Sequence, residues 1–285
     1  MIYNALTIDV EHWWCNEFLK KYLPENKKVF IHKTVDIVLS LFEKYNVTTT
    51  FFILGDVAEK YPEIVEKIYE KGHEIGSHAY SHEPLYRLTR QEVEDEIKRT
   101  NNAIYRITKE KPKGFRAPHA SITNKNKWVF EILEKYSFVY DSSIFPVKTN
   151  LYGLPNAPLG PYFPSSDDIT KNDPNGEILE IPLTAVRIFR FGKYSMNLPV
   201  GGGFYLRTYP LWFIERAIRK VQKEGRPFVA YVHPWEFYDN LPKLNVPPWI
   251  KFEAYNGTGT SFLGKIESIL KKFKNIPLER LVEEI

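Results

Sequence analysis

Two histidines four residues apart, His78 and His82, are the side chains whose spacing best suits a metal ion. They follow a short strand-like run at residues 74–77. On a helical turn or a tight loop, side chains at positions i and i+4 point the same way. Two neutral imidazoles that face one point commonly begin a divalent metal site, although most pairs at this spacing are surface or core histidines. The pair therefore needs support from elsewhere in the chain.

That support comes from two carboxylates near the N-terminus, Asp9 and Glu11, which end an apolar run at residues 5–8. Carboxylates at the C-terminal tip of a strand are typical catalytic groups in α/β barrels. Because the two acids are two residues apart on a strand end, their side chains share one face. Two histidines and one carboxylate leave open positions for water and substrate, as catalytic zinc requires. The other acid is then free to act as a base.

Three further groups of residues follow predicted strands: Arg116 with His119, Asp141, and His233 with Trp235. In a barrel of parallel strands, all of them lie on one rim. A metal polarises a carbonyl group and activates water, a carboxylate takes the water's proton, and an imidazolium protonates the leaving group. The set is therefore what a metal-assisted hydrolase needs.

The elements that must position these residues alternate between strand-like and helix-like patterns. Strands are predicted at residues 5–10, 48–54, 74–77, 114–116, 138–141, 178–182, 186–189 and 228–232. Helices are predicted at residues 33–45, 57–70, 89–107, 125–135, 209–223 and 262–273. This alternation predicts parallel strands joined by right-handed crossovers. Since no clear linker divides the units, we expect residues 1–285 to form a single α/β domain, an irregular (β/α) barrel.

Two local signals sharpen this expectation. Thr89 and Glu92 have the spacing of a capping box, which predicts a helix beginning there. Residues 146–176 hold six prolines and little periodicity. This insertion is either an ordinary long loop or a wall or lid of the site, because long ordered loops in compact domains often serve binding.

Composition excludes some partners. The 285 residues carry 39 Lys and Arg against 35 Asp and Glu, and without a basic block we expect no nucleic-acid partner. No apolar run approaches the roughly 20 residues of a transmembrane helix, and no signal-peptide pattern is present. Cys15 is the single cysteine, so we expect a buried free thiol and a cytoplasmic protein. Whether the protein forms a homo-oligomer is left open by the sequence. Most aromatic residues suit a packed core, and a minority could line a sugar-stacking cleft.

The motifs, in this order, resemble those of the NodB-like polysaccharide deacetylases. The similarity extends from Thr7 to about Phe273 and is closest to the branch with a D-x-[DE] first motif, which includes the exosortase-associated deacetylases. The matching segments are residues 7–11, 72–78, 115–118, 140–146, 201–204 and 231–236. The resemblance implies a distorted (β/α) barrel with about seven strands, and a metal-dependent hydrolase that removes N-acetyl groups from amino sugars.

Roles follow from this resemblance residue by residue. It implies that Asp9 is the general base, that Arg116 orients it, that His233 is the general acid, and that Asp141 tethers this acid. It implies one divalent metal, expected to be zinc, held by Glu11, His78 and His82. It also implies that the backbone N–H of His119 donates to the oxyanion and that Trp235 belongs to the substrate site.

The chain also departs from the family pattern. His12 stands where many relatives carry a second carboxylate, and we favour a rim residue over a substitute metal ligand. Val10 separates the two acids, a spacing that also occurs in relatives resembling cyclic-amide hydrolases such as allantoinase-like proteins. Hydrolysis of a cyclic amide or imide is therefore an alternative to N-acetyl sugar deacetylation, and a catalytically silent sugar-binding protein is a third. The complete set of base, ligands, arginine and acid argues against the third.

Other polar residues receive structural interpretations. We expect His73 to make a structural hydrogen bond and His32 to lie on a helix surface. Glu180 could line the cleft, or it could be a buried, paired carboxylate. Residues 201–203, three glycines, lack the strand and helix context of a phosphate-binding loop, so we expect a turn with a close backbone approach.

Overall fold

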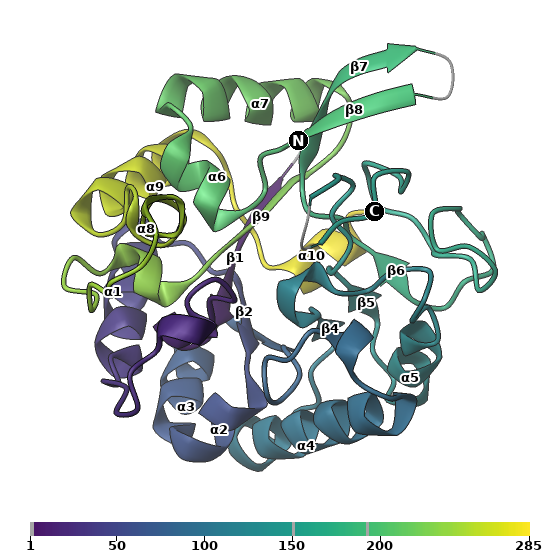
Figure 1. The fold of residues 1–285 in the computed structure, drawn as a ribbon. Coiled ribbons are helices and arrows are strands. Elements are labelled where there is room, and N and C mark those ends of the chain that lie inside the picture. Colours follow the sequence, from purple (N-terminus) through teal and green to yellow (C-terminus); the bar gives the residue numbers. More distant parts are fainter. Residues whose placement is uncertain (1–2, 150–151, 192–193) are drawn as a thin grey trace.

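A computed structural model describes residues 3–149, 152–191 and 194–285 (Figure 1). Its centre is a sheet of seven parallel strands in the order β6-β5-β4-β3-β2-β1-β9. The strands are β1 (Asn4–Val10), β2 (Thr50–Ile53), β3 (Glu74–Ser77), β4 (Gly114–Phe115), β5 (Tyr140–Asp141), β6 (Leu179–Glu180) and β9 (Phe228–Val232). The predicted α/β barrel of about seven strands is confirmed.

The two outer strands of the sheet, β6 and β9, are connected by residues that follow β6. The backbone N–H of Thr184 donates to the Val229 carbonyl at 2.9 Å, and the Val229 N–H donates to Thr184 Oγ1 at 2.7 Å. Further along β9, the Tyr231 N–H donates to the Gly201 carbonyl at 3.0 Å. Residues of two separate segments therefore pair with the edge of β9 that an open sheet would leave free. The barrel is distorted at this point because these contacts take the place of a regular strand.

The described residues form ten α-helices, most of which surround the outside of the sheet, whereas α10 lies near the centre of the view (Figure 1). They are α1 (Ile31–Lys44), α2 (Gly55–Lys60), α3 (Pro62–Glu70), α4 (Arg90–Thr108), α5 (Val129–Lys135), α6 (Gly203–Thr208), α7 (Leu211–Lys223), α8 (Pro248–Tyr255), α9 (Thr260–Lys272) and α10 (Leu278–Glu283). β1 is buried along its whole length, as expected of a parallel strand covered on both faces. On α1, Val35, Val38 and Phe42 recur at helical spacing and are buried in the main core.

The sequence predicted most elements but not all of their boundaries. Thr89 forms the capping box of α4: it accepts from the Glu92 N–H at 3.3 Å, and its own N–H donates to Glu92 Oε2 at 2.7 Å. The helix predicted at residues 57–70 is wrong as one element, because Tyr61 is non-helical and Pro62 begins a new helix. The strand predicted at 186–189 lies outside the barrel, in an antiparallel hairpin of β7 (Ala185–Phe191) and β8 (Tyr194–Pro199).

The proline-rich segment between β5 and β6 contains no helix or named strand among its described residues. Residues 150–151 of this segment lie outside the described part of the chain. Thr149 and Tyr152 line the large cavity of the molecule, so the segment contributes to the wall of that cavity. In the described part of the chain, no helix combines the length and the apolar character needed to cross a membrane.

The register of the sheet explains why one rim collects the polar residues. Hydrogen-bonded neighbours form a row across six strands, made of Val10, Ile53, Ser77, Phe115, Asp141 and Glu180. At the other edge of β1, Ile8 pairs with Val232 of β9. Residues that directly follow these positions therefore emerge at the same end of the barrel, as in other parallel α/β barrels.

Candidate active site

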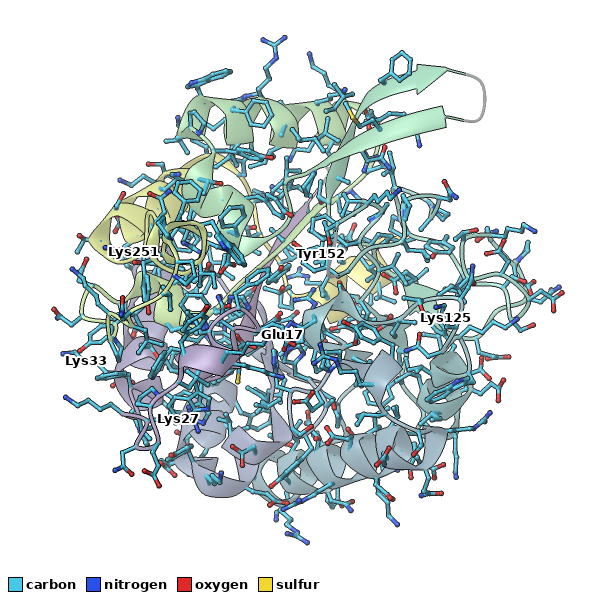
Figure 2. All side chains as sticks on the ribbon, viewed as in Figure 1. Glu17, Lys27, Lys33, Lys125, Tyr152 and Lys251 are labelled. Atoms are coloured by element: carbon cyan, nitrogen blue, oxygen red, sulfur yellow. The ribbon has the colours of Figure 1, made fainter. Side chains whose placement is uncertain are left out.

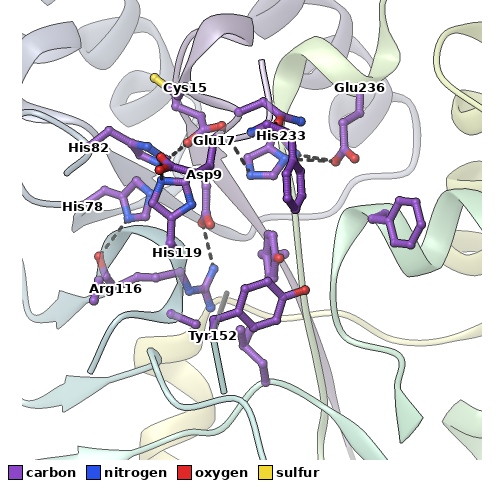
Figure 3. Close-up of a pocket in the computed structure, with 18 of the residues that line it drawn as sticks. Asp9, Cys15, Glu17, His78, His82, Arg116, His119, Tyr152, His233 and Glu236 are labelled. Atoms are coloured by element: carbon purple, nitrogen blue, oxygen red, sulfur yellow. Dashed lines mark hydrogen bonds and ion pairs between the residues drawn. The ribbon is translucent and has the colours of Figure 1, made fainter. Parts of the chain in front are cut away.

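A cavity of about 430 Å³ opens at this rim. Eight of the nine residues proposed from the sequence as site residues line it: Asp9, Glu11, His78, His82, Arg116, His119, His233 and Trp235 (Figure 3). Figure 2 shows Glu17 and Tyr152 near the centre of this face, whereas Lys27, Lys33, Lys125 and Lys251 lie toward the periphery. The ninth proposed residue, Asp141, is not among the residues that line the cavity.

Asp9 and Arg116 form a buried ion pair at the floor of the cavity. Arg116 Nη1 donates to Asp9 Oδ1 at 2.8 Å, and both side chains are almost completely buried. The guanidinium also donates from Nε to the Ser142 carbonyl at 2.9 Å and from Nη2 to Ser142 Oγ at 2.8 Å. Because its donors are held in a rigid planar fork, the arginine fixes the orientation of the Asp9 carboxylate. Oδ2 is the Asp9 oxygen that this contact leaves available.

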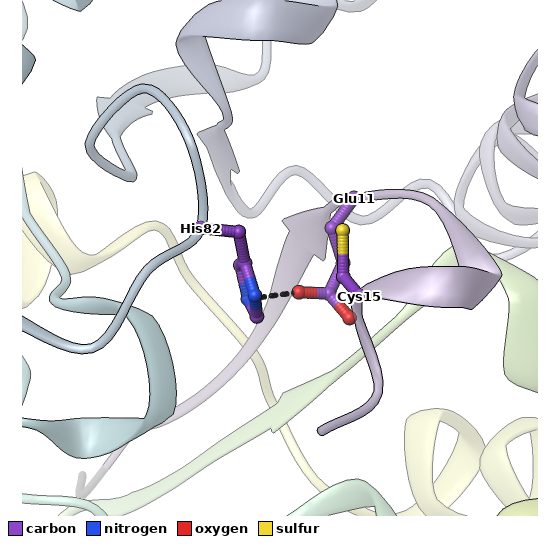
Figure 4. Close-up of side chains that lie close together, drawn as sticks. All are labelled: Glu11, Cys15 and His82. Atoms are coloured by element: carbon purple, nitrogen blue, oxygen red, sulfur yellow. Dashed lines mark ion pairs between the residues drawn. The ribbon is translucent and has the colours of Figure 1, made fainter. Parts of the chain in front are cut away.

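Glu11 and His82 lie next to each other, and Cys15 is close to both (Figure 4). Glu11 Oε2 is in an ion pair with His82 Nε2, and the possible ligand atoms of Glu11, Cys15 and His82 lie within 4.8 Å of one another. Burial works against a charged Glu11, but His82 and His233 outweigh it and hold the pKa of Glu11 well below its usual range. An ionised carboxylate beside an imidazole suits a divalent cation.

His78 lies beside His82 but is not part of the group of ligand atoms that lie within 4.8 Å of one another. The two rings lie 5.3 Å apart between centroids. His78 Nδ1 donates to the Arg116 carbonyl at 2.8 Å, so Nε2 is the nitrogen with a free lone pair. Burial lowers the pKa of His78 to about 4, which keeps the ring neutral. A neutral imidazole whose other nitrogen is held by a carbonyl has the form in which histidines usually bind metals.

Cys15 competes with His78 for the third ligand position, because its sulfur lies close to Glu11 and His82. Burial raises the pKa of the Cys15 thiol well above its usual range, and Glu11 adds to this shift. A cysteine binds a metal as the thiolate, and this shift opposes that form in the absence of a metal. Among the described residues, the group whose possible ligand atoms lie within 4.8 Å of one another is Glu11, Cys15 and His82, whereas the sequence predicted Glu11, His78 and His82.

His233 occupies the opposite side of the cavity. Its Nδ1 is 3.3 Å from Glu236 Oε2, and its Nε2 is 3.5 Å from Glu11 Oε1. The Trp235 ring stacks on the imidazole at 5.1 Å, and its Nε1 donates to Glu11 Oε1 at 3.3 Å. Burial alone would lower the pKa of His233, but the carboxylates of Glu11 and Glu236 outweigh it and raise the pKa to about 9. His233 is therefore an imidazolium at neutral pH.

The prediction that Asp141 tethers His233 is wrong, because the carboxylate beside His233 Nδ1 belongs to Glu236. Asp141 ends β5 and pairs with Glu180 of β6, and it does not line the cavity that contains His233. Its Oδ1 accepts from Ser143 Oγ at 2.5 Å, and Ser143 Oγ in turn accepts from the Ala117 N–H at 2.7 Å. Asp141 therefore supports the segment that follows β4, behind the site and not in it.

Glu180 is the buried, paired carboxylate that the sequence left as one of two options. It neighbours Asp141 across β5 and β6, and its Oε1 accepts from the Ile144 N–H at 3.0 Å. Burial raises the pKa of both carboxyl groups, and the proximity of Asp141 raises that of Glu180 further. Neither carboxyl group lines the cavity.

The remaining three histidines do not line the cavity. His12 stacks on Trp14 at 4.0 Å, burial lowers its pKa to about 4, and it is not among the cavity residues. His12 is thus a buried residue outside the cavity lining and not the rim residue favoured from the sequence. His73 accepts from the Thr49 N–H at 3.2 Å, and His32 is exposed and paired with Glu63.

The sequence did not reveal that Glu236 contacts His233 or that Arg207 holds Glu236. Arg207 Nε donates to Glu236 Oε1 at 2.7 Å, and both side chains are almost completely buried. A Cβ on Gly203 would lie 2.1 Å from Glu236 Oε2, and one on Gly201 would lie 2.5 Å from the Val229 carbonyl. The glycine run is thus the expected close backbone approach. The spacing of His233 and Glu236, three residues apart in a single helical turn, was the signal for the tether.

Comparisons with known proteins agree with this geometry. Residues 24–138 match the family model described as "Polysaccharide deacetylase", and residues 142–283 match "Domain of unknown function (DUF3473)". Residues 24–138 are therefore similar to the polysaccharide deacetylases. The resemblance inferred from the motifs is confirmed at the level of this family.

Among curated proteins, the chain is 32% identical over 145 residues to a peptidoglycan-N-acetylglucosamine deacetylase from Bacillus cereus, which covers 50% of the chain and 52% of that protein. It is 35% identical over 107 residues to a peptidoglycan deacetylase from Helicobacter pylori, covering 38% of the chain and 36% of that protein. It is 41% identical over 86 residues to chitin deacetylase 1 from Saccharomyces cerevisiae, covering 30% of the chain and 29% of that protein. The chain thus spans about half of the first relative's length and less of the other two.

Solved structures support the same fold. A Mycobacterium smegmatis protein provisionally described as a polysaccharide deacetylase superposes with a TM-score of 0.63 at 18% identity, over 99% of this chain and 89% of that one. A family 4 carbohydrate esterase from Streptomyces lividans, solved with acetate, superposes with a TM-score of 0.50 at 15% identity, over 95% of this chain and 86% of that one. A Bacillus anthracis protein described as a pseudoenzyme of that esterase family superposes with a TM-score of 0.52 at 15% identity, over 98% of this chain and 64% of that one. At these identities the superpositions show the fold alone.

Proposed function

We propose that this protein is a metal-dependent hydrolase that removes N-acetyl groups from N-acetylated amino sugars. One observation carries the proposal: a single cavity joins a carboxylate held by an arginine, a carboxylate with two histidines, and a charged histidine. These are the base, the metal donors and the acid that amide hydrolysis requires. The named activities of the Bacillus cereus and Helicobacter pylori relatives support the same substrate class.

Asp9 acts as the base in this proposal. Arg116 holds Oδ1, so Oδ2 takes the proton from the water that attacks the amide carbonyl. The arginine also keeps the carboxylate from turning away, because its other donors are fixed by the Ser142 carbonyl and hydroxyl. The general base is therefore positioned before substrate binds.

His233 acts as the acid. Its Nδ1 faces Glu236, so Nε2 is the nitrogen that gives its proton to the departing amine. Glu236 and Arg207 form the chain of contacts that keeps the ring charged and oriented. Asp9 on one side and His233 on the other would therefore act on the same amide in sequence.

Glu11, His78 and His82 would hold the metal, and we propose zinc because two imidazoles and one carboxylate match its preferred donors. When bound, such a metal polarises the amide carbonyl and stabilises the negative charge that develops on its oxygen. The backbone N–H of His119 is proposed as a further donor to that oxygen. His119 lines the cavity in the left-handed region, at φ 56°.

A cyclic amide or imide is the second candidate substrate, because the same residues could open a small ring. The proposal is tested with purified protein, by zinc titration together with acetate release from N-acetylglucosamine oligomers and ring opening of allantoin and succinimide. Acetate release that depends on metal and is faster than ring opening supports deacetylation. Faster ring opening would replace it with the alternative, and no turnover at any metal loading would leave only sugar binding.

A further inference from the structure

Cys15 lies at the boundary between the main core and the active-site cavity. It ends a short 3₁₀ helix after β1, Trp13–Cys15, in which its N–H donates to the His12 carbonyl at 2.9 Å. The residue belongs to the main hydrophobic cluster and also lines the cavity. A free buried cysteine usually acts as a small apolar residue, so a role for the thiol in the cavity depends on its neighbours.

The neighbours of Cys15 in the cavity are Glu11 and His82 (Figure 4). The possible ligand atoms of the three residues lie within 4.8 Å of one another, and each residue is more than nine-tenths buried. Within the described part of the chain, no other group of three His, Cys, Asp or Glu residues brings its ligand atoms this close together. An ion at this position would therefore have a carboxylate, an imidazole and a thiol around it.

One oxygen of Glu11 indicates a cation independently of the cysteine. Oε1 accepts from Trp235 Nε1 at 3.3 Å, which holds the carboxylate in place. Oε2 forms the ion pair with His82 Nε2, yet no side chain or backbone group of the described residues donates a hydrogen bond to it. A buried carboxylate oxygen without a hydrogen bond costs free energy unless another group, such as a cation, compensates its charge. The unpaired oxygen and the thiol therefore lie at the same candidate position for a metal.

The separation of the donor atoms suits a sulfur ligand. Around a tetrahedral zinc ion, sulfur lies at about 2.3 Å and imidazole nitrogen at about 2.0–2.1 Å from the metal, so these two donors are roughly 3.5 Å apart. Because the ligand atoms of Cys15 and His82 already lie within 4.8 Å, a short approach would enclose such an ion. Magnesium, calcium and manganese favour oxygen donors, whereas a thiolate selects softer metals such as zinc. A sulfur donor would therefore make the site selective for zinc.

The thiol loses its proton when it binds the metal. Burial and the nearby Glu11 raise the pKa of Cys15 well above its usual range, which favours the protonated thiol while no cation is present. A divalent cation reverses this preference, because a coordinating thiol is deprotonated by the metal. The S–H bond breaks, a metal–sulfur bond forms, and the proton leaves to solvent. The raised pKa thus makes protons compete with the metal but does not exclude the sulfur as a ligand.

We propose that the Cys15 sulfur is a ligand of the metal that Glu11 and His82 bind, and that this sulfur gives the site a preference for zinc. The proposal rests on the metal dependence in the proposed function, to which it adds a donor, and not on the sugar substrate. It departs from the ligands implied by the family resemblance, because the third of those, His78, lies outside the close group of ligand atoms.

X-ray absorption at the zinc edge tests the proposal on the zinc-loaded protein. A sulfur ligand gives a shell at about 2.3 Å, whereas nitrogen and oxygen ligands give a shell at about 2.0–2.2 Å. Cys15 is the single cysteine, so a sulfur shell that is present in the wild-type protein and lost in Cys15→Ser identifies this thiolate. Zinc bound to the wild-type protein with only the shorter shell overturns the proposal without any variant. A wild-type protein that binds no zinc overturns it together with the proposed metal dependence.

Competition between zinc and manganese tests the preference for zinc. In Cys15→Ser, the ratio of zinc affinity to manganese affinity should fall roughly 10-fold or more, because a metal ligand is lost. Asn16→Ala is the matched control, since Asn16 is the next residue of the same segment but is not in the group of ligand atoms, and it should keep the wild-type ratio. Equal ratios in the wild-type protein and Cys15→Ser overturn the preference.

The outcome is distinguishable from that of the proposed function. A sulfur shell in a protein that releases no acetate from N-acetylglucosamine oligomers supports Cys15 as a ligand and contradicts the deacetylase. Acetate release by a protein whose bound zinc has no sulfur shell supports the deacetylase and overturns Cys15 as a ligand.

Discussion

Replacing Glu236 with Gln should move the pH dependence of the reaction without removing the site. Glu236 Oε2 lies 3.3 Å from His233 Nδ1, and the pKa of His233 is raised from 6.5 to about 9 by Glu11 and Glu236 against the effect of burial. An opposite charge at this distance typically accounts for about 1–3 pKa units. Removing it makes the imidazolium less favourable, so the pKa of His233 falls.

The sign of the effect on rate follows directly. His233 must be protonated to act, so activity is present below its pKa and is lost as the pH rises through that value. In Glu236→Gln, the basic limb of the kcat/KM profile should therefore move to lower pH by roughly 1 unit or more. If Glu11 is engaged with a metal, Glu236 and the weaker contribution of Asp9 remain to raise the pKa of His233, so Glu236 then dominates the shift.

The assay is acetate release measured from pH 5 to 10 with metal-saturated protein. Glu63→Gln is the matched control, because Glu63 also pairs with a histidine, His32, at 2.7 Å, but on the surface. Glu63→Gln should leave the acidic and the basic limb of the pH profile at their wild-type positions. If the basic limb of Glu236→Gln stays where it is in the wild-type protein while the rate falls at every pH, Glu236 does not set the charge of His233. The assignment of His233 as the acid would then be refuted.

Three further expectations concern the same cavity. Asp9→Asn should lower kcat by about 10²–10⁴-fold and flatten the acidic limb while the metal content by plasma emission stays the same, and a near-wild-type rate would show that another group is the base. His82→Ala should lower the zinc content of purified protein because His82 Nε2 contacts Glu11, whereas unchanged zinc would place the metal elsewhere. Gly203→Ala should reduce activity and shift the basic limb in the same direction as Glu236→Gln, because the new Cβ would lie 2.1 Å from Glu236 Oε2; an unshifted limb would contradict this link.

The sequence was sufficient for the residues that directly follow strands. The periodicity of residues 5–10 and 228–232 predicted β1 and β9, and the polar residues after them could be assigned to one rim from the parallel order alone. The side chains of Asp9, Glu11 and His233 consequently reach one cavity. Such predictions succeed because strand periodicity is local and because all parallel strands end on the same side of a sheet.

The partners of these residues were decided by the tertiary structure. The family resemblance implied Asp141 as the tether of His233, but the Asp141 carboxylate faces Ser143, and Glu236 lies beside His233. Arg207 reaches Glu236 across 29 positions of the chain, and Trp235 reaches Glu11 across 224. No local pattern encodes such contacts, because they depend on how loops pack after the barrel has closed.

The aromatic rings that line the cavity and the Cys15 thiol illustrate the same limit. Phe18 and Trp249 are more than two hundred residues apart in the chain and meet only because the segment after β1 packs against α8. The sequence indicated that some aromatic residues could bind sugar and that the thiol is buried; only the packing decided which rings border the cavity and that Cys15 lies beside Glu11 and His82. Residue type and local spacing determine which chemistry is available, whereas the distances that select among those chemistries arise from long-range packing.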